Sequence, residues 1–219
     1  MAGCQPDFGV RASAVQSLRV LAVSADPPEA APGAKVSYAA LVVDGAGQRD
    51  DALVDWAYCK KQKALAQLDD ADPLCFVFAA DYLVPLGKGT AVAGKLPSDA
   101  CSLFGPDVPP AQPGMPPGRP VDPDATGGFY QPVRLILPDP SDAQFPNVLG
   151  LGESRVGCGL AGATAGTFDA DSTSAAQLTD LHVDNAWTAP GATGAVKLWV
   201  VLRDDRGGVS WERYAVAVQ

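Results

Sequence analysis

Basic side chains are scarce in this chain. Its 16 Lys and Arg residues are outnumbered by 25 Asp and Glu residues, so the formal net charge is −9. Nucleic-acid binding requires clustered Lys and Arg to neutralise phosphates, and an anionic membrane repels an acidic surface. The composition therefore argues against nucleic acid and bare membrane as partners.

Long apolar runs are also missing. No stretch approaches the roughly 20 apolar residues of a membrane-spanning helix, so we expect membrane attachment only through a covalent anchor or a partner. With 47% hydrophobic and 19% charged residues, the chain has the composition of a folded protein. Its 219 residues can bury a substantial core, most simply as one elaborated domain, with two small domains as the alternative.

Residue types that carry catalysis are few. The one histidine, His182, lies in an apolar alternation typical of a strand. The stretch 152–156 begins like a nucleophile elbow but has Val156 where that motif needs glycine. Glycine loops for phosphate or dinucleotide binding are absent. We therefore expect no catalytic residues and no enzymatic turnover.

Metal ligands follow no zinc pattern, because the chain has no Cys-x-x-Cys pair and a single histidine. Calcium matches better, since it takes oxygen ligands. The acidic loop residues that a sandwich could gather at one end are Asp44, Asp50, Asp51, Asp204 and Asp205. No twelve-residue calcium loop is present, and solvated turn carboxylates are the alternative. We expect no resident cofactor, with calcium as the one candidate cation.

Four of the five cysteines lie in the body of the chain, at Cys59, Cys75, Cys101 and Cys158. An even number in an acidic, Lys-poor chain predicts disulfides rather than a metal site. Three pairings are possible. The preferred one joins Cys59 to Cys75 and Cys101 to Cys158, so that each bond staples an inserted loop. The first bond would close about 15 residues and contribute roughly 3 kcal/mol; four reduced thiols are the alternative.

The fifth cysteine is preceded by small residues. Met1-Ala2-Gly3-Cys4 resembles the end of a bacterial lipobox, in which the cysteine is lipidated and becomes the first mature residue. The basic and apolar segments of a signal peptide do not precede it here, so a chance match is the alternative. Residues 5–17 are polar and lack periodicity, as in a tether. The motif implies a lipid anchor at Cys4 and export to the outer membrane or the extracellular surface.

Most regular structure is predicted to be β. Apolar residues alternate over 195–202, the charged turn 203–208 ends in two glycines, and β-branched and aromatic residues follow. This pattern predicts a closing hairpin of strands 195–202 and 209–218. The same criteria predict four further strands and a core containing Trp56 and either Trp199 or Trp211. Those strands are 18–23, 35–43, 53–58 and 129–137.

The middle of the chain, residues 59–194, interrupts this framework with insertions. Residues 60–68 are rich in helix formers, and 75–79 are a strand candidate. Residues 85–94 are interpreted as irregular. A helix is predicted around 161–168, although glycines within it weaken the pattern.

Prolines and glycines crowd residues 97–128 and predict an extended surface loop. Such a loop loses less conformational entropy on docking than a Gly-Ser loop, because proline already fixes φ. We therefore assign candidate binding residues to it, namely Pro109, Pro110, Met115, Pro116 and Pro117.

Two regions carry a resemblance to known modules. They are the Pro-Gly turn and following strand at 28–38, and the closing turn at 203–208. With the strand, turn, strand, turn, tryptophan-strand order of 18–58, they resemble the immunoglobulin-like and PKD-like modules of bacterial surface proteins, and uncharacterised lipoproteins of myxobacterial type. The similar parts, 18–58 and 188–218, cover about a third of the chain.

The resemblance implies an all-β, immunoglobulin-like β-sandwich with a loop-rich, partly helical insertion. Residues 1–17 would be a tether and 18–219 one domain. It also implies an exported, non-catalytic structural or interaction module that binds an envelope or extracellular protein or a glycan. The alternative is a secreted carbohydrate-binding protein or hydrolase with a site in the middle insertion. Two tryptophans exposed side by side would favour that alternative.

Overall fold

The computed structural model describes residues 13–60, 83–100, 113, 131–137, 158–174, 183–203 and 208–219. Those residues form thirteen β-strands and no helix, and every pair of named strands is antiparallel. The all-β class predicted from the alternating patterns is therefore confirmed for this part of the chain. The helix predicted at 60–68 lies, apart from Lys60, outside the described residues.

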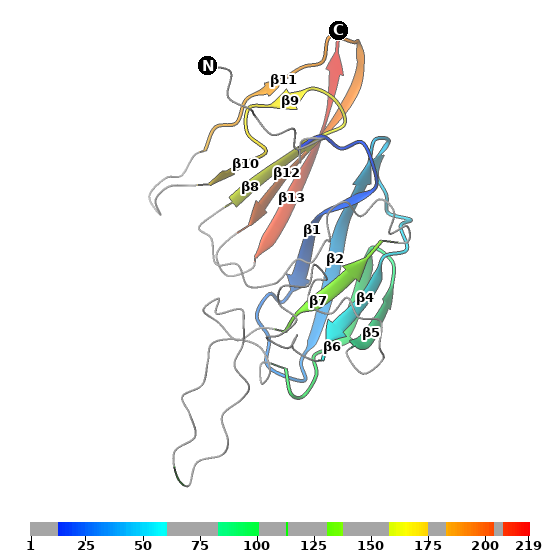
Figure 1. Ribbon diagram of the computed structural model, residues 1–219, viewed down its shortest axis with the longest axis vertical. Coiled ribbons are helices and arrows are strands. Elements are labelled where there is room, and N and C mark those ends of the chain that lie inside the picture. Colours follow the sequence, from blue (N-terminus) through cyan, green and yellow to red (C-terminus); the bar gives the residue numbers. More distant parts are fainter. Residues whose placement is uncertain are drawn as a thin grey trace, which may run out of the picture.

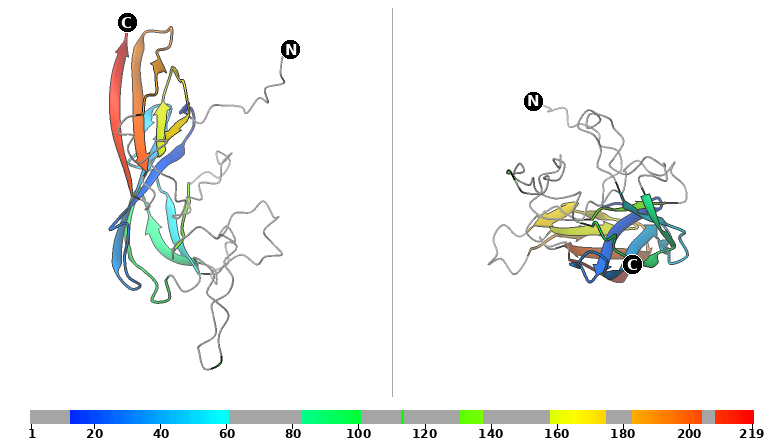
Figure 2. Two further views of the ribbon diagram at one scale, coloured as in Figure 1. Left: turned by 90° about the vertical axis from the view of Figure 1, so that its left-hand side faces the viewer. Right: turned by 90° about the horizontal axis from the view of Figure 1, so that it is seen from below.

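Three sheets contain most of the strands (Figures 1 and 2). The first consists of β1 (Arg19–Asp26), β2 (Lys35–Asp44), β3 (Gly47–Gln48) and β6 (Ala91–Lys95). The second has the order β5 (Leu83–Lys88), β4 (Asp55–Cys59), β7 (Val133–Ile136). The third has the order β10 (Ser172–Ser174), β8 (Cys158–Ala163), β12 (Gly194–Arg203), β13 (Val209–Val218). A small pair, β9 (Thr167–Phe168) and β11 (Trp187–Thr188), completes the fold.

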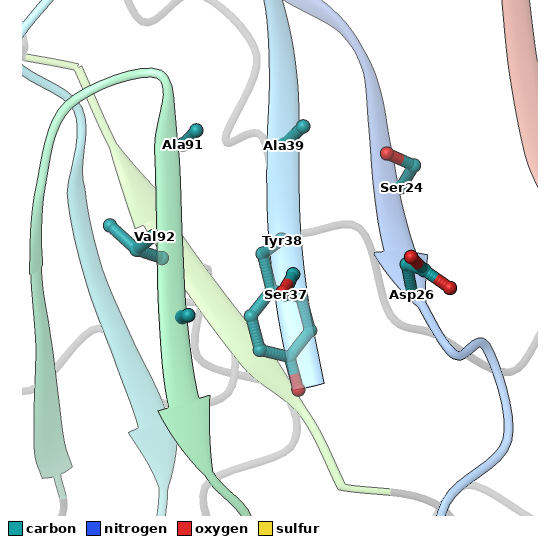
Figure 3. A pocket seen from close by; sticks show the side chains of 8 residues that line it. Ser24, Asp26, Ser37, Tyr38, Ala39, Ala91 and Val92 are labelled. Atoms are coloured by element: carbon teal, nitrogen blue, oxygen red, sulfur yellow. The ribbon is translucent and has the colours of Figure 1, made fainter. Parts of the chain in front are cut away.

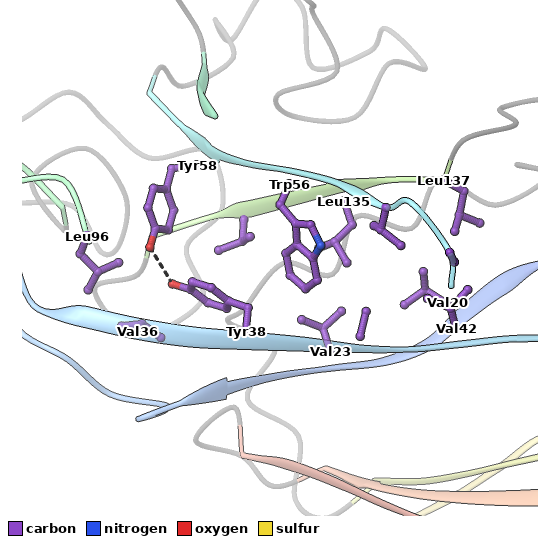
Figure 4. Packing of buried hydrophobic residues seen from close by; sticks show 14 of the residues in the cluster. Val20, Val23, Val36, Tyr38, Val42, Trp56, Tyr58, Leu96, Leu135 and Leu137 are labelled. Carbon is purple, nitrogen blue, oxygen red and sulfur yellow. Dashed lines mark hydrogen bonds between the residues drawn. The ribbon is translucent and has the colours of Figure 1, made fainter. Parts of the chain in front are cut away.

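The first core lies between the first and second sheets. Trp56 at its centre is 0% exposed, and its indole Nε1 donates a hydrogen bond to the Gly89 carbonyl oxygen at 2.7 Å. The Tyr38 ring lies 6.0 Å from the Trp56 ring, centroid to centroid. Its hydroxyl donates to the Tyr58 hydroxyl at 3.2 Å (Figure 4). Burial raises the pKa of both tyrosines, so the two hydroxyls stay protonated and act as a structural pair.

A second core forms on the opposite face of β1 and β2, against the third sheet. It contains Leu21, Leu41, Trp199 and Val201, all buried. A bulge between Val20 and Ala22 leaves Leu21 as the extra residue of β1. The Leu21 carbonyl accepts a hydrogen bond from Arg203 Nη2 at 3.1 Å, which ties β12 to β1. The β1–β2 layer therefore lies between the other two sheets (Figure 4).

The six predicted strands are confirmed as β1, β2, β4, β7, β12 and β13. Five have small changes of boundary, whereas β7 covers only 133–136 of the predicted 129–137, and residues 129 and 130 lie outside the described residues. Trp56 and Trp199 are core residues, as predicted, and Trp199 is 1% exposed.

Two predictions in the middle of the chain were wrong. Residues 85–94 are not irregular but form β5 and β6, which belong to different sheets. Pro85 is tolerated because β5 is an edge strand with a bulge opposite Trp56 and Ala57. Glycines with positive φ at Gly87 and Gly89 let the chain turn between the sheets.

The helix predicted around 161–168 is replaced by the end of β8 and by β9. The small residues of this segment allow the layers to pack closely, and they do not form a helix. A Cβ atom at Gly162 would lie 3.3 Å from Leu21 Cδ1 and 3.4 Å from Val15 Cγ2, so the sheets approach closely there. The glycine in β8 is therefore explained by the close approach of β8 to β1.

Gly166, between β8 and β9, provides a test of this arrangement. Its φ is +80°, and an added Cβ would lie 2.5 Å from the Thr188 carbonyl oxygen. We expect Gly166→Ala to lower the free energy of unfolding by about 1–3 kcal/mol. The control Gly191→Ala meets nothing within 4 Å and should change it by less than about 0.5 kcal/mol. Equal urea midpoints for the two variants would contradict the β8–β9 conformation.

Candidate functional site

The first half of β2 is covered on one face only. Its even-numbered residues face the first core, as Val36 and Tyr38 do. On the opposite face, Leu41 is buried beneath the third sheet, whereas Ser37 is exposed and Ala39 is half-buried. The cover stops near Leu21, where Arg203 ends β12. The described residues leave the sheet face beyond that point uncovered, and we consider this face the candidate functional site.

Strand register arranges this open face in rows. Ala39 lies between Ser24 of β1 and Ala91 of β6, and the next row is Asp26, Ser37 and Ala93. In the third row Lys35 lies directly opposite Lys95. Directly opposite side chains are about 5 Å apart and project from the same face of the sheet. We call the surface formed by these eight residues the open face.

A groove with a volume of about 470 Å³ runs across the first two rows (Figure 3). Its lining also includes Tyr38, which is 4% exposed and whose side chain is directed into the first core, so it contributes its backbone. The other lining residues are mostly alanine and serine. Such short side chains let another polypeptide approach the sheet closely, while hydroxyls offer hydrogen bonds.

Charge on the open face lies in its second and third rows. Asp26 of β1 supplies one carboxylate in the second row, and Lys35 and Lys95 bring two ammonium groups together in the third. Like charges directly opposite one another are unfavourable. An acidic side chain from a bound partner would relieve this repulsion. The arrangement therefore fits the binding of a polar polypeptide with an acidic group placed over the lysine pair.

The predicted calcium ligands take a different arrangement. Arg49 donates from Nη1 to Asp44 Oδ2 at 2.8 Å, and from Nε to Asp51 Oδ1 at 2.9 Å. Asp44 Oδ1 also accepts hydrogen bonds from two backbone amides of the β2–β3 turn, Ala46 and Gly47. Hydrogen bonding to Arg49 lowers the pKa of the Asp44 and Asp51 carboxyls. The neighbouring Asp50 accepts from Gln48 Nε2 at 2.6 Å.

The turn that holds these acids is far from the end of β12. Lys197, near the start of β12, donates to the Ala46 carbonyl oxygen. Arg203 lies six residues further along the strand, or about 20 Å at 3.3 Å per residue. Asp204 and Asp205, which follow it, lie outside the described residues. The described residues contain no group of three acidic, cysteine or histidine side chains arranged to hold a metal, and calcium binding stays a prediction.

Several predicted site residues fall in parts of the chain that the structure does not describe. These are Cys4, Cys75, Cys101, His182 and the loop residues Pro109, Pro110, Met115, Pro116 and Pro117. Cys59 ends β4 with a buried side chain. Cys158 begins β8. The disulfide pairing and the lipid anchor stay predictions.

The four tryptophans all pack inside the protein or against its strands. Trp56 and Trp199 belong to the two cores, and Trp211 packs against the second. Trp187 packs on Phe168, and its Nε1 donates to the Ala165 carbonyl oxygen at 3.2 Å. The paired exposed tryptophans that would favour sugar stacking are therefore not present.

Among the residues that the structure describes, none forms a helix with the length and apolarity required to span a membrane.

Comparison of the chain with protein-family models, with curated proteins and with solved structures finds no match.

Sequence reasoning missed the open face because it missed β6. Without β6, the first half of β2 would be a sheet edge, and Ser37 and Ala39 would be ordinary solvent-facing residues. The available signal was the alternation of Ala91, Ala93 and Lys95 with Val92 and Leu96, which has the period of a half-buried strand. The nearby Pro85 and the glycines obscured it.

The Arg49 cluster yields a pH-dependent prediction. In Arg49→Gln we expect the pKa of Asp44 and Asp51 to rise towards the usual aspartate value, because the charge-assisted hydrogen bonds are lost. A lowered carboxyl pKa stabilises the fold above the ordinary pKa, and that stability is lost as pH falls through the lowered value. The variant should therefore lose less stability on acidification. Carboxyl carbon NMR titration measures the pKa values.

The control for this titration is Lys88→Gln, which removes the ion pair between Lys88 and Asp55. Lys88→Gln should leave the pKa of Asp44 the same as in the unaltered protein. If Asp44 titrates identically in the unaltered protein and in Arg49→Gln, the ion cluster does not exist in solution.

Proposed function

We propose that this protein is a non-catalytic, exported interaction module whose open face binds an envelope or extracellular protein. The observation that carries the proposal is the open face itself. In its second half the same face of β2 is covered by protein, through the packing of Leu41 against Trp199 and Val201. In its first half it is a groove lined by serine and alanine. Its pleated surface has the shape that another strand or sheet packs against.

The chemistry of the open face favours a polypeptide partner. Short side chains expose the sheet over two rows, while Asp26 and the Lys35–Lys95 pair supply charges of both signs in adjacent rows. A partner with an acidic residue near the lysines and a hydrogen-bond donor near Asp26 would match this pattern. Mixed charges at the rim of a small-residue surface give specificity and orientation.

Location and anchoring form the second part of the proposal. Cys4 would carry a lipid anchor, residues 1–17 would be the tether, and residues 18–219 would form one elaborated immunoglobulin-like domain. Two facing antiparallel sheets around Trp56 support an immunoglobulin-like sandwich. Disulfides at Cys59, Cys75, Cys101 and Cys158 would suit an oxidising compartment. The burial of Cys59 at the end of β4 is consistent with a stapled strand.

The proline-rich loop 97–128 would be a second contact region, because loops held on a rigid framework commonly carry recognition. The competing hypothesis, sugar binding through exposed tryptophans, loses support because the tryptophans are occupied by core packing. We therefore retain a protein partner as the function that the described geometry supports best.

The test is affinity capture from the native envelope, with quantitative mass spectrometry of bound proteins. Ser37→Arg places a long charged side chain in the middle row of the open face and should abolish capture of the specific partner. Ser172→Arg, at an exposed position of β10 outside both the groove and the loop 97–128, is the matched control and should retain it. Deletion of 106–123 should weaken capture, with a smaller effect on the melting temperature.

Retention of every specific partner by Ser37→Arg would remove the open face from the proposal. Retention by the deletion variant would remove the loop. A saturable hydrolytic activity of the purified chain would contradict the non-catalytic assignment.

A further inference from the structure

Most edge strands of the described sheets are short or irregular. β10 has 3 residues and β7 has 4. β5 contains Pro85 and pairs with β4 across a register shift, and β1 is bulged at Leu21. Short length, proline and bulges all prevent an edge from pairing with another chain.

β13 has none of these features. It is a strand of 10 residues without proline. It pairs with β12 in continuous register from Val209 opposite Arg203 to Val218 opposite Gly194. It ends the third sheet, and no described strand pairs with its outer edge. Figure 2 shows it along the rim of the molecule. A regular edge of this length offers a row of backbone donors and acceptors for another strand.

We propose that β13 pairs antiparallel with β13 of a second copy of this chain, across a twofold axis beside Tyr214. The third sheets of the two copies would then join into one continuous sheet through their β13 strands. This homodimer is independent of the open face, which lies on the first sheet.

Symmetry limits the possible registers of such a pair. Directly opposite residues in an antiparallel pair project from the same face of the sheet. A twofold axis perpendicular to the sheet leaves every side chain on the face from which it projects. Neighbouring residues of one strand project from opposite faces, so the residue on the axis must lie opposite its own copy. The alternative registers can therefore be compared by asking which residue lies on the axis.

Charge excludes the registers at the middle of the strand. An axis beside Glu212 would place two carboxylates opposite one another, and an axis beside Arg213 would place two guanidinium groups there. Both are unfavourable. An axis beside Trp211 keeps only 209–213 of β13 paired, and one beside Ala215 keeps only 212–218.

An axis beside Tyr214 keeps residues 210–218 paired without like charges directly opposite. Glu212 then lies opposite Val216 of the second copy, and Arg213 lies opposite Ala215. The two Tyr214 rings come together, and each is 53% exposed in the single chain. Aromatic pairs of this kind stabilise antiparallel strands. An axis beside Tyr214 therefore avoids opposed like charges, keeps most of β13 paired and buries the two exposed rings.

The experiment uses the full chain in sedimentation velocity over a range of concentrations. The unaltered protein should form a dimer that dissociates on dilution. Tyr214→Lys places two lysines opposite one another and should abolish the dimer, whereas Tyr214→Phe should retain it. Leu202→Lys is the matched control, because Leu202 is 58% exposed on β12 and lies away from the edge. It should leave the dimer unchanged.

Register is tested by oxidation of cysteine variants, with peptide mapping of the new crosslink. Tyr214→Cys should form a symmetric 214–214 disulfide, since opposite Cα atoms lie about 4.5–5.5 Å apart. Glu212→Cys should not crosslink to itself. A chain that stays monomeric, a dimer that survives Tyr214→Lys, or a 212–212 crosslink would each overturn the proposal.

Discussion

The two-sided burial of the β1–β2 layer is the constraint on which the rest of the structure depends. One face of β2 packs through Tyr38 on Trp56, and the other packs through Leu41 on Trp199. A strand buried on both faces must be apolar at consecutive positions, which accounts for the run from Ala40 to Val43. Both neighbouring sheets depend on this layer, because each buries its own apolar residues against it.

The open face exists because the third sheet covers only part of that layer. Arg203 bonds to the bulged Leu21 and marks where the cover ends. Beyond it, the side chains of Ser37 and Ala39 replace those of Leu41 and Val43 on the same face of β2. The change from large apolar to small residues therefore coincides with the change from core to surface. The sequence of β2 therefore determines both the buried layer and the proposed docking site.

Strands with a clear period of two could be predicted from the sequence, and the β12–β13 hairpin was the clearest. Its alternation and its turn residues agree with one another. The β5–β6 corner could not be predicted, because Pro85, Gly87 and Gly89 are typical of both a loop and a strand that changes sheet. Gly162 suggested a poor helix, although its role is close packing between layers. The open face depends on which strands become neighbours, and no local pattern contains that information.

The central claim is that one face of β2 changes from core to open surface between Leu41 and Ser37. Urea unfolding of Leu41→Ala and Ser37→Ala tests it most directly, since both changes lie on that face. Leu41 is 0% exposed, so its variant should lose about 2–4 kcal/mol of unfolding free energy. Ser37→Ala should change it by less than about 0.5 kcal/mol. A small loss for Leu41→Ala, or a comparably large loss for Ser37→Ala, would contradict the layered account.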